Sequence, residues 1–369
     1  MSYILVTGAT GFLGGAVVAN LIQRGLASSL LLLVRAANAG EGLERIRQQL
    51  QLFEVPASQL NGLTEGQILL GDFNDVIAFT GDRRLDDVTH VINCAAIASF
   101  ANNPLIRPVN VVGTFAFAQR MAKSQKLKRF LHVGTAMACG TNHQSPIRES
   151  WDIAPEEEHL VPYTASKAEI EHKIRSELPE LPFVVARPSI VVGHTRLGCK
   201  PSGSIFWVLR MVQMLGKFTC GLDEKVDIIP VDYCADALVK LALKEQLAHD
   251  LYHVSAGVGS SCTIEEIDIP MARARGVEPC STHYQKVSQD EIMELADEFK
   301  ERVGPCNRRL VLQALRLYGG FAELNYVFDN ERLLAEGIAQ PPRFTSYVGL
   351  CAKTSENISV QEQMKWDFK

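Results

Sequence analysis

A tyrosine and a lysine stand four residues apart in the segment YTASK, with only small residues between Tyr163 and Lys167. On a helix, positions i and i+4 share one face, so the phenol and the ammonium would be neighbours. A nearby positive charge favours the phenolate and would make the tyrosine a usable proton donor and acceptor near neutral pH. A surface helix carrying an unrelated tyrosine and lysine has the same spacing. The other segments of the chain must separate these two interpretations.

A glycine-rich loop near the N-terminus predicts a dinucleotide site. Gly8, which ends the apolar segment YILVTG, is followed by Gly11 and Gly14 at three-residue intervals, at the start of a segment with helical composition. Glycines permit a tight turn and close backbone approach to a pyrophosphate, and the N-terminus of the following helix favours an anion. A flexible glycine turn without a ligand is the alternative, but the strand–turn–helix context favours dinucleotide binding.

The ends of the next predicted strands bear on the type of dinucleotide. The second strand ends in LLLLVRAAN, with Arg35 and no acidic residue. A guanidinium suits the 2′-phosphate of NADP, whereas a carboxylate would bind the ribose hydroxyls of NAD. We therefore expect NADPH; the alternative is that Arg35 is only a solvated residue at the strand end. Asp72, at the end of the third strand, is a candidate acceptor for the adenine amine.

Strand-like and helix-like segments alternate from the N-terminus to about Pro188, and the strand segments are continuously apolar. This pattern is typical of a parallel sheet covered on both faces. The predicted fold class is α/β, a Rossmann-type doubly wound parallel sheet with a smaller, mainly helical substrate subdomain. We expect residues 1–188 plus about 226–256 to form the dinucleotide-binding domain, and about 189–225 plus 257–369 to form the substrate subdomain.

Thr135 ends the fifth predicted strand, in HVGTAM, on the edge of the sheet where the cofactor would lie. Thr135, Tyr163 and Lys167 are therefore expected to converge on one crevice. The threonine hydroxyl would hydrogen-bond a carbonyl oxygen, and the tyrosine would protonate that oxygen as hydride arrives. The lysine would lower the pKa of the tyrosine and bond the nicotinamide ribose.

Together these motifs resemble an extended short-chain dehydrogenase/reductase, and the finer features are similar to its thioester reductase and fatty acyl reductase branch. The resemblance covers roughly residues 3–250 and is carried by several segments. They are VTGATGFLGG, LLLVRAANAGEGLERIRQQL, NCAAIASFANNPLIRPVNVVGT, FLHVGTAM, YTASKAEIE, ARPSIVVG and IIPVDYCADAL.

The resemblance implies NADPH-dependent reduction of an acyl thioester to an aldehyde or an alcohol. It also implies a catalytic set of Thr135, Tyr163 and Lys167, with Asn110 supporting the lysine. The branch usually has serine where this chain has Gly134, so one hydroxyl is missing. The implied cofactor contacts are Gly8, Thr10, Gly11, Phe12, Leu13, Gly14, Arg35, Asp72, Phe73, Asn93, Ala95, Tyr163, Lys167, Pro188, Ser189 and Ile190.

Composition and charge limit the kinds of partner that we expect for this protein. The 369-residue chain has a net charge of −5 and no cluster of basic residues, so we expect no nucleic-acid partner. Nine scattered cysteines without a C-x-x-C pair predict reduced thiols, no metal site and a cytoplasmic location. No apolar run reaches the roughly 18 residues that span a bilayer.

Without an adenylation segment or a Gly-x-Asp-Ser carrier motif in the sequence, the thioester is expected to arrive on coenzyme A or on a separate carrier protein. Pairing of two helices per subunit is common in the superfamily, so a homodimer is a further expectation.

Three other functions fit parts of this pattern. An alcohol dehydrogenase or carbonyl reductase would use the same catalytic set. A sugar-nucleotide epimerase or dehydratase should carry polar and basic groups in its second domain, and the strongly apolar segment 203–218 disfavours it. A dinucleotide-sensing regulator could lose Tyr163 or Lys167, and both are present.

Overall fold

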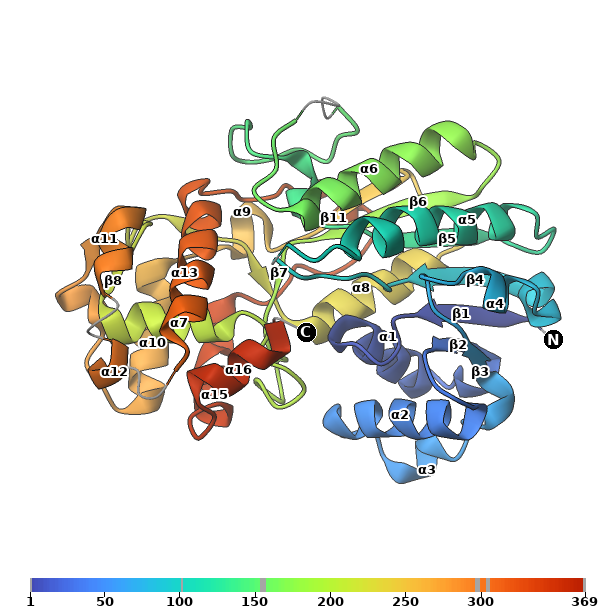
Figure 1. The fold of residues 1–369 in the computed structure, drawn as a ribbon, viewed down its shortest axis with the longest axis horizontal. Coiled ribbons are helices and arrows are strands. Elements are labelled where there is room, and N and C mark those ends of the chain that lie inside the picture. The colour runs from blue at the N-terminus through green and yellow to red at the C-terminus, as the bar shows by residue number, and fades with distance from the viewer. Residues whose placement is uncertain (1, 101, 153–156, 296–298, 303–305, 368–369) are drawn as a thin grey trace.

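One parallel sheet lies at the centre of the molecule (Figure 1). The computed structural model describes residues 2–100, 102–152, 157–295, 299–302 and 306–367. Seven strands pair in the order β3-β2-β1-β4-β5-β6-β11, and every pair is parallel. They are β1 (Tyr3–Thr7), β2 (Leu30–Val34), β3 (Ile68–Leu70), β4 (Val88–Asn93), β5 (Arg129–Val133), β6 (Phe183–Pro188) and β11 (Leu251–Val254). The predicted α/β doubly wound fold is confirmed.

Helices cover both faces of this sheet, which explains its continuously apolar strands: all residues of β2 are buried. In Figure 1, α1, α2 and α8 lie on one face, and α5 and α6 lie on the other. The strand order reverses at β1, whose neighbours are β2 and β4. Ligands of such sheets bind beyond the carboxyl ends of the strands at this point. The helices are α1 (Phe12–Gln23), α2 (Ala39–Leu52), α8 (Val231–Leu243), α5 (Thr114–Ala122) and α6 (Pro162–Glu177).

The sixth strand is shorter than its apolar sequence PFVVARPSIVVG predicts. β6 ends at Pro188, which has no backbone N–H with which to extend the ladder. The chain continues as β7 (Ile190–Val191), which pairs with β10 (Ile228–Ile229) in a separate two-stranded sheet. The chain therefore leaves the central sheet beside the crevice.

A second group of helices lies beyond the end of the sheet that is opposite the N-terminus (Figure 1). Its central helix is α7, whose Phe206, Trp207 and Met211 are fully buried. The apolar segment around 203–218 thus forms the core of this group. The group comprises α7 (Phe206–Leu215), α10 (Ile264–Arg275), α11 (Gln289–Glu294), α12 (Phe299–Arg302), α13 (Arg308–Glu323), α15 (Val348–Thr354) and α16 (Val360–Asp367).

Part of the C-terminal region packs back against the sheet. Asp329 N donates to Ile147 O (2.8 Å), and Phe328 N donates to the buried carboxylate of Asp227 (3.0 Å). Leu333 and Ile338 join the hydrophobic cluster that contains α8 and β11. The C-terminal hundred residues therefore pack partly against the sheet and partly within the helical group.

The remaining elements are short. No helix in the part of the chain described above is both long and apolar enough to cross a membrane. The short helices are α3 (Ala57–Leu60), α4 (Ile77–Thr80), α9 (Gly257–Ser260) and α14 (Glu331–Ala335), with a π-helical turn over Pro108–Gly113. Single 3₁₀ turns cover Ala27–Ser29, Glu65–Gln67, Arg83–Asp87, Ala136–Cys139, Cys280–Thr282 and Phe344–Ser346. Two small strand pairs are β8 (Lys217–Phe218) with β13 (Gln285–Lys286), and β9 (Lys225–Val226) with β12 (Cys262–Thr263).

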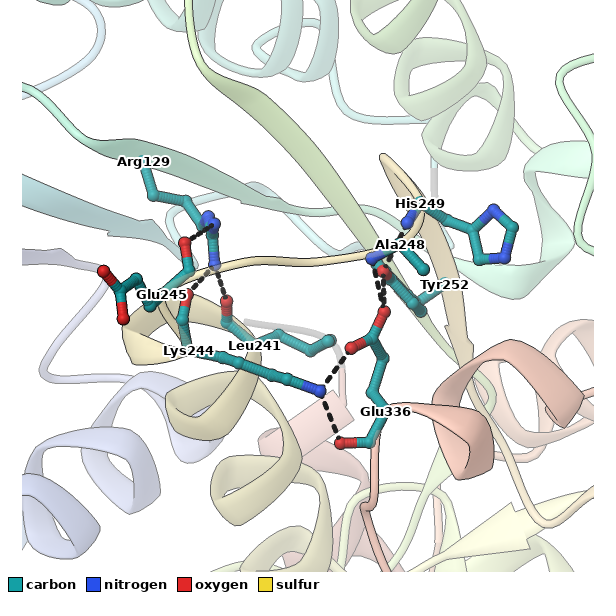
Figure 2. A network of polar contacts seen from close by, with 8 residues as sticks. All are labelled: Arg129, Leu241, Lys244, Glu245, Ala248, His249, Tyr252 and Glu336. Atoms are coloured by element: carbon teal, nitrogen blue, oxygen red, sulfur yellow. Dashed lines mark hydrogen bonds and ion pairs between the residues drawn. The ribbon is translucent and has the colours of Figure 1, made fainter.

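One carboxylate ties the returning segment to the sheet (Figure 2). Glu336 accepts hydrogen bonds from Lys244 Nζ (2.6 Å), Ala248 N (2.7 Å) and the hydroxyl of Tyr252 (2.6 Å). Arg129, at the start of β5, donates to the Lys244 carbonyl (2.6 Å). Burial raises the pKa of Glu336, but these hydrogen bonds outweigh it and hold the pKa below its ordinary value.

Replacement of this carboxylate should destabilise the fold. Glu336→Ala is expected to lower the free energy of unfolding by about 2–3 kcal/mol, because it removes the acceptor of the Tyr252 hydroxyl and of Ala248 N. Lys244 would keep its hydrogen bond to the backbone carbonyl of residue 336. Because the pKa of Glu336 is lowered on folding, the difference from wild type should shrink as the pH falls. Urea unfolding at neutral and acid pH measures both effects. The control Glu331→Ala removes an exposed carboxylate of α14, and an equal loss there would contradict this role.

Candidate functional site

The glycine loop after β1 has the close contacts that a phosphate-binding turn requires. Gly8 has a φ of 67°, and a Cβ there would stand 2.9 Å from the backbone nitrogen of Ala95. A Cβ on Gly14 would overlap the carbonyl oxygen of Gly8. Both positions therefore need glycine, the first for its dihedral angle and the second for helix–strand contact.

The helix after this loop has an N-terminus that is open to an anion. α1 begins at Phe12 behind Gly11, and among the described residues no side chain caps it and none in its first turn is acidic. Its first backbone N–H groups are free to bind a pyrophosphate. Thr10, Phe12 and Leu13 are half-buried around the turn, and Gly11 is exposed. The loop and helix end fit the expected dinucleotide.

Two arginines gather at the ends of β2 and β3. Arg35, whose side chain is 71% exposed, has its Nη1 3.5 Å from Asp72 Oδ2. The guanidinium of Arg45 donates to the Arg35 carbonyl. Asp72 also accepts a hydrogen bond from Asn74 N (2.8 Å). The strand ends thus place an arginine beside a carboxylate, with a second arginine bonded to the backbone of the first.

Two of the predicted cofactor contacts turn their side chains into the interior. Asn93 is fully buried, and its amide meets the Thr7 hydroxyl (2.6 Å) and His132 Nδ1 (3.1 Å). Thr7 Oγ1 accepts from Ala95 N (3.1 Å), so this network shapes the loop after β4. Phe73 is buried among the aromatic rings beneath α5. The structure gives Asn93 and Phe73 supporting positions, with their side chains packed away from the crevice.

Helix α6, which carries Tyr163 and Lys167, is anchored to the end of β5 by its lysine. Lys167 is 2% exposed, and its Nζ donates to the carbonyl of Val133 (2.6 Å), two residues before Thr135. Burial lowers the pKa of Lys167 to about 8, and the charge of Glu171 opposes that shift. Thr135 is half-buried, with its hydroxyl 3.4 Å from Met137 N. The structure therefore joins two of the three predicted catalytic residues through adjacent backbone.

The electrostatic part of the tyrosine prediction is wrong. The pKa of Tyr163 is raised, first by burial and then by the negative charge of Glu171. We expected Lys167 to lower it. The lysine ammonium instead donates to a buried carbonyl, and a buried phenol resists ionisation. Tyr163 is held as a neutral phenol, which is the form that donates a proton.

Asn110 lies in the π-helical turn, and its side chain hydrogen-bonds the loop after β4. Its Oδ1 accepts from Ile97 N (2.8 Å), and its Nδ2 donates to Ile97 O (3.1 Å) and to Ser166 Oγ (3.0 Å). Ser166 in turn donates to the Tyr163 carbonyl (2.7 Å). These bonds connect the loop after β4 to the first turn of α6. Asn110 reaches the catalytic helix through Ser166, whereas we predicted support of Lys167.

The segment after β6 completes this edge of the sheet. Pro188 is buried at the end of the strand, and Ser189 N donates to Val254 O (3.0 Å). Ser189 and Ile190 are half-buried. Their backbone runs past the carboxyl end of β6.

Three aromatic rings, of Phe100, Tyr318 and Phe321, form an aromatic wall near Tyr163. The sequence did not indicate this cluster. The ring of Phe100, in the loop after β4, lies 6.0 Å from Tyr163, 5.5 Å from Tyr318 and 5.2 Å from Phe321. Tyr318 contacts Trp207 of α7 (5.8 Å). The apolar face of α13 was a signal for packing, but nothing in the sequence indicates that Phe100 would contact both this face and Tyr163.

Comparisons with known proteins identify a family and several relatives. The family model described as male sterility protein, an NAD-binding family, matches residues 6–238. The fatty acyl-CoA reductase wat of Drosophila melanogaster is 27% identical over 281 residues, which cover 65% of this chain and 53% of that protein. The aldehyde reductase lnaA of Aspergillus flavus is 25% identical over 267 residues, covering 68% and 25%. The chain thus spans between a quarter and about half of these relatives.

Solved structures share the fold over nearly the whole chain. The terminal R domain from the myxalamid PKS-NRPS biosynthetic pathway superposes with a TM-score of 0.76 at 21% identity, covering 96% of this chain and 90% of that one. UDP-glucose 4-epimerase of Thermus thermophilus, in complex with NAD, gives a TM-score of 0.62 at 20% identity, with 96% and 99% covered.

Cofactor binding at the glycine loop can be tested by adding a side chain to the loop. Gly14→Ala should weaken NADPH binding by at least about ten-fold, because the added methyl group overlaps the Gly8 carbonyl and opens the turn. Fluorescence titration with NADPH measures the Kd. Gly81→Ala is the matched control, since a Cβ there meets nothing within 4 Å. Unchanged affinity in Gly14→Ala would contradict cofactor binding at this loop.

Proposed function

The chain belongs to the NAD-binding family described as male sterility protein, an extended short-chain dehydrogenase/reductase family, and we propose that it reduces an acyl thioester with NADPH. The observation that carries the proposal is the position of Tyr163. It lies on a helix anchored beside Thr135, at the same sheet edge as the glycine loop. An aromatic wall that suits an apolar acyl group faces it.

NADPH, when bound, supplies the hydride. The loop after β1 and the N-terminus of α1 would hold its pyrophosphate. Thr135 would direct its hydroxyl to the carbonyl oxygen of the substrate, and Tyr163 would transfer its proton to that oxygen. Lys167 would provide a positive charge that favours the phenolate left behind. Addition to a thioester gives a hemithioacetal, which collapses to an aldehyde and a free thiol.

An acyl thioester is favoured over other carbonyl compounds by two features. The partly exposed rings of Phe100 and Phe321 offer an apolar surface near the tyrosine, which suits an acyl chain better than a sugar diphosphate. The buried ring of Tyr318 packs against Phe100. One relative is named a fatty acyl-CoA reductase. Another relative is named an aldehyde reductase, so reduction of a free aldehyde is the second candidate.

The proposed preference for NADPH rests on Arg35 and Arg45. Guanidinium groups bind phosphate through paired, charge-assisted hydrogen bonds. Arg35→Ala should raise the Kd of NADPH by about ten-fold or more and leave that of NADH nearly unchanged. Arg83→Ala removes another exposed arginine and serves as the control. Equal losses for both cofactors in Arg35→Ala would contradict recognition of the 2′-phosphate.

The reaction itself is tested by NADPH oxidation at 340 nm with acyl-CoA thioesters of graded chain length, with matched aldehydes and ketones in parallel. We expect oxidation with the thioesters, release of free coenzyme A and an aldehyde or alcohol product by mass spectrometry. Turnover of carbonyl compounds alone would overturn the thioester proposal in favour of carbonyl reduction.

A separate variant tests the proposed role of Tyr163 as the proton donor. Tyr163→Phe should lower kcat by at least about 100-fold, because the proton donor is removed, while NADPH still binds. Tyr284→Phe is the control, since it removes a hydroxyl that donates to the Cys220 carbonyl within the helical group. Turnover retained in Tyr163→Phe would exclude it as the donor.

A further inference from the structure

A fully buried carboxylate lies one helical turn beyond the catalytic lysine. Glu171 is 0% exposed on α6 and pairs with Arg187 of β6, which is 1% exposed. Both Nε (2.9 Å) and Nη2 (2.7 Å) of Arg187 donate to the same oxygen, Oε2. The remaining Nη1 donates to the Ser150 carbonyl (3.2 Å).

The second oxygen of this carboxylate is unpartnered. Glu171 Oε1 is buried, and no hydrogen-bond donor reaches it among the described residues. It occupies the space beside the backbone of Gly134, where a Cβ would overlap it. Gly134 lies between Val133, which accepts from Lys167, and Thr135. The serine usual at this position in similar enzymes could not be accommodated beside Glu171 as it stands here.

This geometry differs from that of a carboxylate serving only an ion pair. A carboxylate dedicated to an arginine commonly uses both oxygens in a bidentate pair. Here Oε2 accepts both hydrogen bonds from Arg187. Oε1 lies between the ends of β5 and β6 without a hydrogen bond from the described residues. A buried, unsatisfied acceptor on a charged group calls for a role beyond packing.

The buried charges near the lysine include two cations and one anion. Lys167 and Arg187 are the cations, and Glu171 is the anion. Burial raises the pKa of Glu171, and the charges of Arg187 and Lys167 oppose that shift. The other titratable groups that face the lysine are neutral. Burial raises the pKa of the Cys94 thiol to about 12, and burial together with Lys167 lowers the pKa of His132 well below its ordinary value. A buried ammonium needs a compensating negative charge.

We propose that Glu171 is a positioning residue of the active site, whose buried carboxylate keeps the ammonium of Lys167 charged beside Tyr163 and requires glycine at position 134. Glu171 acts through space, while Lys167 keeps its hydrogen bond to Val133. The inference rests on the proposed function only in that Lys167 serves catalysis.

The test measures the pKa of Lys167 directly. In protein labelled with ¹³Cε-lysine, the Lys167 signal is identified by its loss in Lys167→Arg, and its pKa is followed by NMR titration. From a wild-type value of about 8, Glu171→Gln should lower it by at least about one unit. Glu169→Gln, on the exposed side of the same helix, should leave it unchanged. An unchanged Lys167 pKa in folded Glu171→Gln would overturn the proposal.

A second pair of variants covers failure of Glu171→Gln to fold. Arg187→Met and the double variant Glu171→Gln/Arg187→Met differ only in the carboxylate, and the double variant leaves no unpaired charge from the pair. The Lys167 pKa should be lower in the double variant, and equal values would refute the inference.

Activity provides an independent readout. The alkaline limb of the pH–rate profile should move to lower pH in Glu171→Gln, together with the NMR value, and Glu171→Asp should restore it in part. Because the NMR titration needs no turnover, failure of the thioester assay would reject the proposed function and leave this test decisive.

Discussion

The hydrogen bond from Lys167 to the Val133 carbonyl is the contact on which the rest of the site depends. It joins the catalytic helix to the end of a central strand, so Tyr163 and Thr135 are held by two directly connected elements. Because the sheet is parallel, that strand end shares an edge with the glycine loop. The ammonium is buried, so loss of this acceptor would leave a charge without its hydrogen bond.

Burial also determines the charge state of the site. Tyr163 stays a neutral phenol, Cys94 stays a thiol, and His132 stays uncharged, because each would lose hydration on ionising. Burial raises the pKa of Glu171 as well, and the ion pair with Arg187 opposes that shift. The interior beneath the crevice is thus a small arrangement of fixed charges around one lysine, and such preorganised charges act strongly in a water-poor site.

The helical group contributes aromatic rings to the surroundings of Tyr163. Phe100 from the sheet side touches Tyr318 and Phe321 of α13, so the wall over the tyrosine is shared between the two parts of the molecule. The residues that we propose for catalysis belong to the sheet and its helices, whereas Tyr318 and Phe321 belong to α13. Reaction chemistry and substrate choice can therefore vary independently in this fold.

The amino-acid sequence by itself determined the features that depend on local patterns. Apolar runs predicted the strands, glycine spacing predicted the turn after β1, and the i,i+4 spacing placed Tyr163 and Lys167 on one helix. It did not predict the break at Pro188, the inward amide of Asn93 or the direction of the Tyr163 pKa shift. Only the tertiary structure decided these, together with the meeting of Phe100 with α13 and of Glu171 with Gly134. Each depends on burial and on contacts between residues distant in the chain, which no local spacing encodes.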